Sequence, residues 1–190
     1  IIHKVKEEKE KHFDEIISSL MPFGLSTNYR GKTEKEEGDL TLYASNGVTY
    51  IKRSEIQKGE SMIDAYKILI SKTSAEHAGE PGRDGKFRVI PSSIRVLEPS
   101  EVCTHSYFLV GNWSNREMAE NALSYIKTKF VRFLALQCVS GFGLSKLVFS
   151  FVPMQDFSKP WTDKELYAKY NLTQDEIDFI ESMIKPMEVE

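Results

Sequence analysis

An apolar stripe at helical spacing in residues 115–137 constrains the fold more than any other feature of this 190-residue sequence. Ser114 and Glu117 match a capping box, in which each side chain satisfies a free backbone N–H of the other residue. The pattern predicts one long helix from Asn115 to about Gln137. Its apolar side must pack on another layer of structure. The stripe consists of Met118, Ala122, Leu123, Ile126, Phe130, Phe133 and Leu134.

Short runs of β-branched and aromatic residues predict that this second layer is a sheet. Asp39–Tyr43 and Val48–Lys52 flank Asn46-Gly47, the dipeptide favoured in type I′ hairpins because both central residues need positive φ. We therefore expect a hairpin over 39–52. Further strands are expected at Ala65–Ser71, Phe87–Ile90, Ile94–Glu98, Val102–Val110 and Leu147–Val152.

Helices are also expected at both ends of the chain. Residues 1–21 predict a leading helix that stops before Pro22. Thr162 with Glu165, and Thr173 with Glu176, match capping boxes of two short helices. The sequence therefore predicts an α+β fold: a mixed or antiparallel sheet, one long packed helix and a C-terminal helical hairpin. We expect residues 1–160 to form the main domain and residues 161–190 the hairpin.

Charge is distributed unevenly along the chain. The formal net charge is -3, but residues 40–160 hold 15 Lys and Arg against 11 Asp and Glu, a net of +4. Residues 161–190 hold 3 against 8, a net of -5. A mildly basic body permits a cationic face toward an anionic partner, and an acidic tail is typical of a solvated helical face.

The isolated cysteines and the lack of a membrane-length apolar run favour a cytoplasmic location. Cys103 and Cys138 have no CxxC or Cys/His neighbours, which favours reduced thiols, with a disulfide or a catalytic thiol as alternatives. No apolar run approaches the ~20 residues of a membrane helix. Because the sequence begins at Ile1 and not at Met, we expect a processed or expressed piece of a longer protein.

Catalytic signatures are largely missing. The sequence contains no GxxxxGK[ST] phosphate loop, HExxH or GxSxG motif. One pattern is compatible with a Mg²⁺-dependent nuclease: Asp84-Gly85-Lys86, with Asp64 or Glu80 as a second carboxylate. A turn of Arg83-Asp84-Gly85-Lys86 in a loop explains the same residues, since nuclease ligands need strand-held positions.

Several segments carry a resemblance to a known family. Residues 149–167 read Phe-Ser-Phe-Val-Pro-Met-Gln-Asp-Phe-Ser-Lys-Pro-Trp-Thr-Asp-Lys-Glu-Leu-Tyr, and upstream pieces include Pro22-Phe23-Gly24-Leu25 and Glu101-Val102-Cys103-Thr104. Together with residues 66–72, 119–130 and 175–187, they resemble the C-terminal region of bacterial restriction–modification proteins with an N6-adenine methyltransferase and a DNA target-recognition region, Type IIG or Type I-like. The resemblance spans nearly the whole chain, and Gln137–Lys146 departs from it by being less basic and polar.

The resemblance implies a DNA sequence-specificity fragment that is not catalytic by itself. Its partners would be double-stranded DNA and the catalytic methyltransferase or restriction region or subunit, with S-adenosylmethionine and Mg²⁺ used by the parent enzyme and no cofactor in this fragment. The family's [DNS]PP[YFW] tetrapeptide and S-adenosylmethionine loop are missing, so no catalytic residue carries over. A fragment with its own nuclease site and a subunit-docking module, in which the acidic tail helices contact a methyltransferase or helicase subunit, are the alternatives.

The basic residues of the central body and of one long loop, Thr73–Lys86, supply the expected DNA contacts. A reader of duplex DNA needs Lys and Arg for phosphates and Arg, Asn, Gln, Ser or Thr for base edges. We expect Lys52, Arg53, Lys72 and Lys86 to contact phosphates, and Arg83 and Arg30 to read base edges. A solvated surface position is the alternative for each of these six residues.

Overall fold

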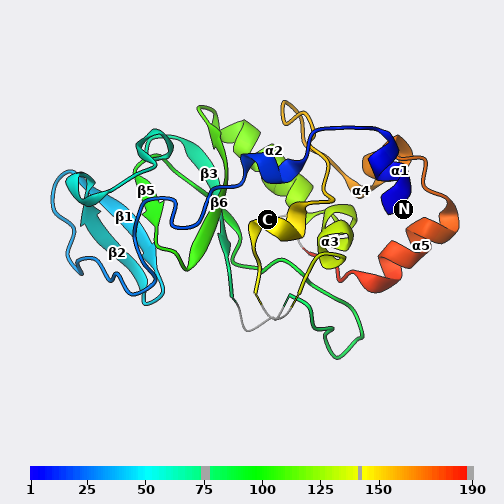
Figure 1. Ribbon diagram of the computed structural model, residues 1–190, viewed down its shortest axis with the longest axis horizontal. Coiled ribbons are helices and arrows are strands. Elements are labelled where there is room, and N and C mark those ends of the chain that lie inside the picture. Colours follow the sequence, from blue (N-terminus) through cyan, green and yellow to red (C-terminus); the bar gives the residue numbers. More distant parts are fainter. Residues whose placement is uncertain (74–77, 141–142, 188–190) are drawn as a thin grey trace.

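Two three-stranded sheets and five α-helices make up the described part of the computed structural model, residues 1–73, 78–140 and 143–187. In Figure 1 the strands β1, β2 and β5 lie at one end of the molecule and α1, α4 and α5 at the other. The second sheet and the helices α2 and α3 lie between them. The expected α+β class is confirmed, although the strands form two small sheets.

The first sheet has the order β2-β1-β5. Strand β1 (Asp39–Ala44) pairs with β2 (Gly47–Lys52) in antiparallel fashion and with β5 (Glu101–Cys103) in parallel. The expected hairpin is confirmed, but its type I′ turn is wrong. Ala44 pairs with Gly47, which leaves Ser45 and Asn46 in the turn, and only Gly47 has positive φ.

The second sheet is antiparallel and has the order β4-β3-β6. Strand β3 (Tyr66–Ser71) lies in the middle, with β4 (Arg95–Leu97) and β6 (Tyr107–Trp113) at its sides. The expected single strand Val102–Val110 is wrong, because it divides into β5 and the first part of β6, which belong to different sheets. The chain turns between them because Thr104 N–H bonds the Tyr43 carbonyl, while the Ser106 carbonyl accepts from Lys72 N–H.

Two further expected strands are also wrong. Phe87 makes only isolated bridges, to Pro81 and Ile184, and Val89 has a φ of 71° that interrupts an extended run. The apolar run at Leu147–Val152 instead contains a 3₁₀ turn, Lys146–Phe149. Val148, Phe149 and Val152 are buried without pairing in a named strand, and Leu147 is exposed, which shows that a short apolar run does not specify a strand by itself.

The expected leading helix over residues 1–21 is mostly wrong. Helix α1 covers only Ile2–Glu7, and Lys9 then adopts a φ of 51°. The chain runs on with a 3₁₀ turn at Phe13–Ile16 and two bridges, from His12 to Pro153 and from Ile17 to Val110. Val5, Phe13 and Ile17 are therefore buried by separate contacts and not by one helical face, and Leu20 is exposed.

The expected long helix is broken at Thr128. Helix α2 spans Arg116–Lys127 and α3 spans Lys129–Leu136, with Thr128 extended at ψ 151° between them. The Thr128 hydroxyl accepts from Val131 N–H, and the Asp163 carboxylate accepts from both amides that open α3, those of Lys129 and Phe130. These partners stabilise a second helix start. Asn115, not Ser114, caps α2.

The two C-terminal helices are confirmed with their capping boxes. Helix α4 spans Asp163–Lys169 after Thr162, and α5 spans Gln174–Met183 after Thr173. Residues of both helices share a hydrophobic cluster with α2 and α3, and the ring of Tyr170, directly after α4, stacks on Phe130 at 5.0 Å. The division of the chain at residue 160 stays a prediction.

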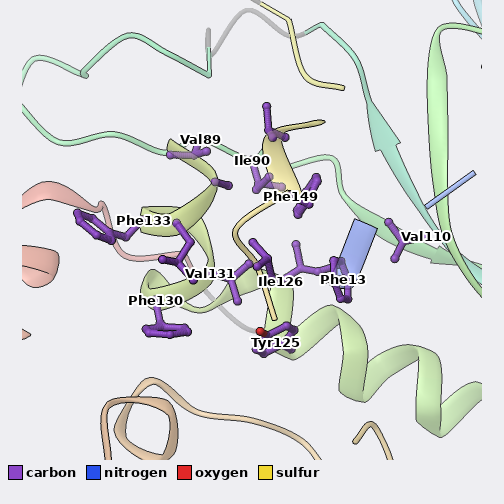
Figure 2. Packing of buried hydrophobic residues seen from close by; sticks show 14 of the residues in the cluster. Phe13, Val89, Ile90, Val110, Tyr125, Ile126, Phe130, Val131, Phe133 and Phe149 are labelled. Atoms are coloured by element: carbon purple, nitrogen blue, oxygen red, sulfur yellow. The ribbon is translucent and has the colours of Figure 1, made fainter. Parts of the chain in front are cut away.

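The core has two parts, and β3 separates them. Ile68 and Ile70 belong to the larger cluster, which surrounds α3 and includes the labelled aromatic rings of Figure 2. Leu69 belongs to the smaller cluster between the two sheets. Because both faces of β3 are buried, its position is fixed, and the chain that leaves its carboxyl end starts from a rigid support.

Candidate functional site

The carboxyl ends of β1, β3 and β5 meet at one edge of the molecule. The turn Thr104–Ser106 joins them: Thr104 N–H bonds the Tyr43 carbonyl at 3.0 Å, and Lys72 N–H bonds the Ser106 carbonyl at 3.0 Å. His105 N–H bonds the Leu25 carbonyl at 2.9 Å and ties the preceding loop to the same place. We call Arg30, Ser45, Lys72, His105 and Ser106 the carboxyl edge.

Three polar atoms of the carboxyl edge are shielded from solvent and have no hydrogen-bond partner among the described residues. They are Lys72 Nζ, His105 Nε2 and Ser106 Oγ. Lys72 follows the rigid strand β3 directly, and its carbonyl accepts from Leu144 N–H at 2.7 Å, so its backbone is held on two sides. Buried polar groups are almost always hydrogen-bonded, so these three groups require acceptor atoms from ordered water or from a ligand.

The electrostatics of the carboxyl edge favour an anion. Burial lowers the pKa of Lys72, and burial together with the Lys72 charge lowers the pKa of His105. The nearby Cys103 thiol gives no compensating charge, because burial raises its pKa to about 12. A bound anion would stabilise the charged forms of both Lys72 and His105.

Arg30 brings a guanidinium group to the same edge. Its Nη1 donates to the Thr27 carbonyl at 2.8 Å and to Ser45 Oγ at 2.7 Å, so it is held beside the turn of the β1–β2 hairpin. Gly31 follows with a φ of 70°, and a Cβ there would lie 2.5 Å from Thr49 Oγ1. Only glycine fits that approach without displacement, and it fixes the loop that carries Arg30.

Lys52 and Arg53 lie at the opposite, amino end of β1, because Lys52 pairs with Asp39. Arg53 makes a bidentate contact with Asp64, at 2.9 and 2.6 Å, and Lys52 Nζ lies 3.8 Å from a Glu36 carboxylate oxygen. Their expected phosphate contacts stay a prediction, and these cations already have carboxylate neighbours.

Arg83 and Lys86 belong to the long loop, of which residues 74–77 lie outside the described part. Arg83 is exposed. Lys86 Nζ donates to the Glu181 carbonyl of α5 at 3.1 Å, and its amide donates to Asp84 Oδ1. The expected turn at residues 83–86 is thus present, and no contact joins Lys86 to the described carboxyl edge.

The carboxylates considered for a nuclease do not come together. Asp64 pairs with Arg53, and Asp84 lies 3.5 Å from Lys185. Within residues 1–73, 78–140 and 143–187, no three His, Cys, Asp or Glu side chains gather in a way that could hold a metal ion.

His105 and Ser106 were not predicted as site residues from the sequence. Both were placed in the middle of one expected strand, where alternate side chains would have been structural. Only the division of that strand between two sheets creates the turn that presents them, and the local sequence carries no turn signal such as glycine or proline.

Comparison of the chain with family models, with curated proteins and with solved structures gave no match. Across the described residues, no helix combines the length and apolar character needed to cross a bilayer.

Proposed function

We propose that this chain is the DNA target-recognition fragment of a restriction–modification enzyme, not catalytic alone, and that its carboxyl edge contacts the DNA backbone. The observation that supports this most directly is the group of unpartnered atoms on Lys72, His105 and Ser106. A phosphate oxygen accepts hydrogen bonds from an ammonium, an imidazole N–H and a hydroxyl, which is the set of donors that this turn offers.

The different exposure of Lys72 and Arg30 favours different roles for them in DNA binding. Lys72 is half-buried at the end of a rigid strand, which suits a contact that fixes the register of the duplex. Arg30 is exposed on a loop and keeps donors free beyond its two intramolecular bonds, which suits a base edge such as guanine O6 and N7. Arg83, on the long loop, remains a second proposed base reader. S-adenosylmethionine and Mg²⁺ would act in the catalytic region of the parent, which would be the other partner.

Salt dependence of DNA binding tests the proposal. Binding of a fluorescent random-sequence duplex would be measured by anisotropy over a range of NaCl concentrations. The wild-type chain should lose affinity with salt, with a slope of about 0.9 per phosphate contact. The double substitution Arg30→Gln/Lys72→Gln should lower affinity and reduce the magnitude of the slope by about 2 if both residues contact phosphates, or by about 1 if Arg30 reads a base.

A matched control removes two cations from the opposite edge. Lys52→Gln/Arg53→Gln changes the formal charge by the same amount, but its cations lie beside Glu36 and Asp64. We expect a slope close to that of the wild type, a result that would contradict the phosphate contacts expected for Lys52 and Arg53 from the sequence. Equal losses in the two double variants would show a general charge effect, and salt-independent wild-type binding would exclude a phosphate interface.

A further inference from the structure

The hydrogen bonds of the Arg30 guanidinium all come from one of its nitrogens. Nη1 donates to the Thr27 carbonyl at 2.8 Å and to Ser45 Oγ at 2.7 Å, which uses both hydrogens of that nitrogen. Among the described residues, no acceptor engages Nε or Nη2. The edge that carries Nε–H and one Nη2–H is therefore open, and its two parallel donors match a pair of neighbouring acceptors.

Ser45 fixes the direction of this open edge. Its hydroxyl accepts from Arg30 and donates to the same Thr27 carbonyl at 3.2 Å, so the three groups close a ring of hydrogen bonds. Ser45 lies in the β1–β2 turn, because Ala44 pairs with Gly47. The guanidinium is thus tied to a turn between two paired strands as well as to its own loop, and it has less rotamer freedom to lose on binding.

The surroundings of Arg30 favour a base edge over a phosphate. The sheet of this hairpin lies at one end of the molecule (Figure 1), and Arg30, Ser45 and Asn46 are all exposed. The major groove of B-DNA admits a two-stranded ribbon, and guanine presents the acceptors O6 and N7 side by side there. Adenine pairs N7 with an amino donor, which would face one of the two Arg30 donors, and neither pyrimidine offers two acceptors.

We infer that Arg30 reads one guanine of the target through its Nε–Nη2 edge, and that Ser45 is the positioning residue that sets this specificity. The inference rests on the proposed DNA-recognition function. Ser45 acts through Arg30 and need not touch the DNA itself. Without the hydroxyl, one of the two bonds that orient the guanidinium is lost. Arg30 then keeps its charge and can turn toward phosphates, so the guanine preference falls while affinity for DNA as a whole is retained.

The test is selection of bound duplexes from a library with a randomised centre, followed by sequencing. The wild-type chain should enrich guanine at one position by about fivefold or more over each other base. Ser45→Ala should lower the enrichment at that position alone and change affinity for the whole library by less than about twofold, because phosphate contacts remain. Ser45→Thr keeps the hydroxyl and should restore the preference. Arg30→Lys keeps the charge without the parallel donors and should abolish it.

A modified base tests the contact directly, and a second serine serves as the control. 7-Deazaguanine at the enriched position lacks the N7 acceptor, so it should weaken wild-type binding about tenfold and leave the binding of Arg30→Lys unchanged. Ser54→Ala removes an exposed hydroxyl from the 3₁₀ turn Arg53–Glu55, beyond the opposite end of the hairpin, and should keep the full guanine enrichment.

Three results would overturn the inference: guanine enrichment that survives Arg30→Lys, enrichment unchanged in Ser45→Ala, or equal losses in Ser45→Ala and Ser54→Ala. Salt-dependent binding without any base preference would also overturn it, but the phosphate contacts of the proposed function would stand. Wild-type binding that does not depend on salt would instead refute the proposed function itself, and this inference with it. The two failures are therefore distinguishable.

Discussion

Lys67 lies in β3 and Lys72 directly follows that strand, and the two lysines meet opposite environments. Lys67, at the amino end of β3, is fully buried, and its Nζ donates to the carbonyls of Ile63, Ala65 and Glu98 at 2.9–3.1 Å. Lys72, just past the carboxyl end, has a shielded Nζ with no hydrogen-bond partner in the described structure. A lysine side chain therefore joins three backbone carbonyls at the amino end of β3 and is an unsatisfied donor at the carboxyl end.

The contrast extends to the first sheet. At the amino end of β1, Lys32 Nζ lies 2.6 Å from Asp39 and Arg53 is bidentate on Asp64. At the carboxyl end, the hydrogen bonds of Arg30 within the described residues go to a carbonyl and a hydroxyl. Counting cations cannot separate these two ends, because both are basic. What separates them is whether the fold already supplies acceptors, and an end without them is free to take an external anion.

The largest expected effect concerns stability at the two lysines. Lys67→Met removes the donor of three buried carbonyls, and we expect the free energy of unfolding to fall by about 2 kcal/mol. Lys72→Met has the same change of shape and charge but removes an unsatisfied ammonium, so stability should stay the same or rise. Urea unfolding of both variants and the wild type measures the difference. A loss of similar size in both variants would break the comparison.

The pH dependence of unfolding gives a smaller effect of known sign. Burial lowers the pKa of Lys67 to about 8 from its ordinary value of 10.5. The folded protein thus releases this proton before the unfolded chain does, and between about pH 8 and 10.5 the unfolded chain binds more protons. Stability should therefore rise with pH across this window, by about 1 kcal/mol between pH 7.5 and 9.

The pKa of Lys72 is lowered in the same direction, and Lys72 is still present in Lys67→Met. The difference between the wild type and this variant therefore isolates the contribution of Lys67. The rise in unfolding free energy should be smaller in Lys67→Met than in the wild type. Identical profiles for the two proteins would mean that the three carbonyls hold the ammonium charged despite its burial.

Local chemistry in the sequence predicted those elements whose ends are fixed by nearby residues. The hairpin over 39–52 and the helices capped by Thr162 and Thr173 are present because their signals act within a few residues. Strand β3 was predicted because its apolar run is typical of a buried strand, and its middle residues are indeed buried on both faces.

Elements decided by distant residues could not be predicted in this way. The break at Thr128 depends on Asp163, more than thirty positions away, and the split of residues 102–110 depends on Tyr43 and Lys72. The same reason applies to the site. Lys72 and Arg30 were identified as cations, but their proximity to one turn, and the presence of His105 in it, follow from the pairing of β1 with β5 and of β3 with β6.

The smallest expected effect tests whether the carboxyl edge is one electrostatic unit. Burial and, to a lesser extent, the Lys72 charge lower the pKa of His105. Lys72→Met should raise the His105 pKa only part of the way toward 6.5, because burial remains. NMR titration of the imidazole Cε1–H measures this change. Lys86→Met is the control, since Lys86 contacts Glu181 and should leave His105 unaffected.

Inorganic phosphate sharpens the same titration. An anion that joins Lys72 and His105 favours the imidazolium, so phosphate should raise the pKa of His105 in the wild-type chain and much less in Lys72→Met. An equal rise in both proteins would indicate general ionic screening. A His105 pKa that responds neither to phosphate nor to loss of the lysine would show that the two donors do not act on one anion, and this would contradict the proposed anion site at the carboxyl edge.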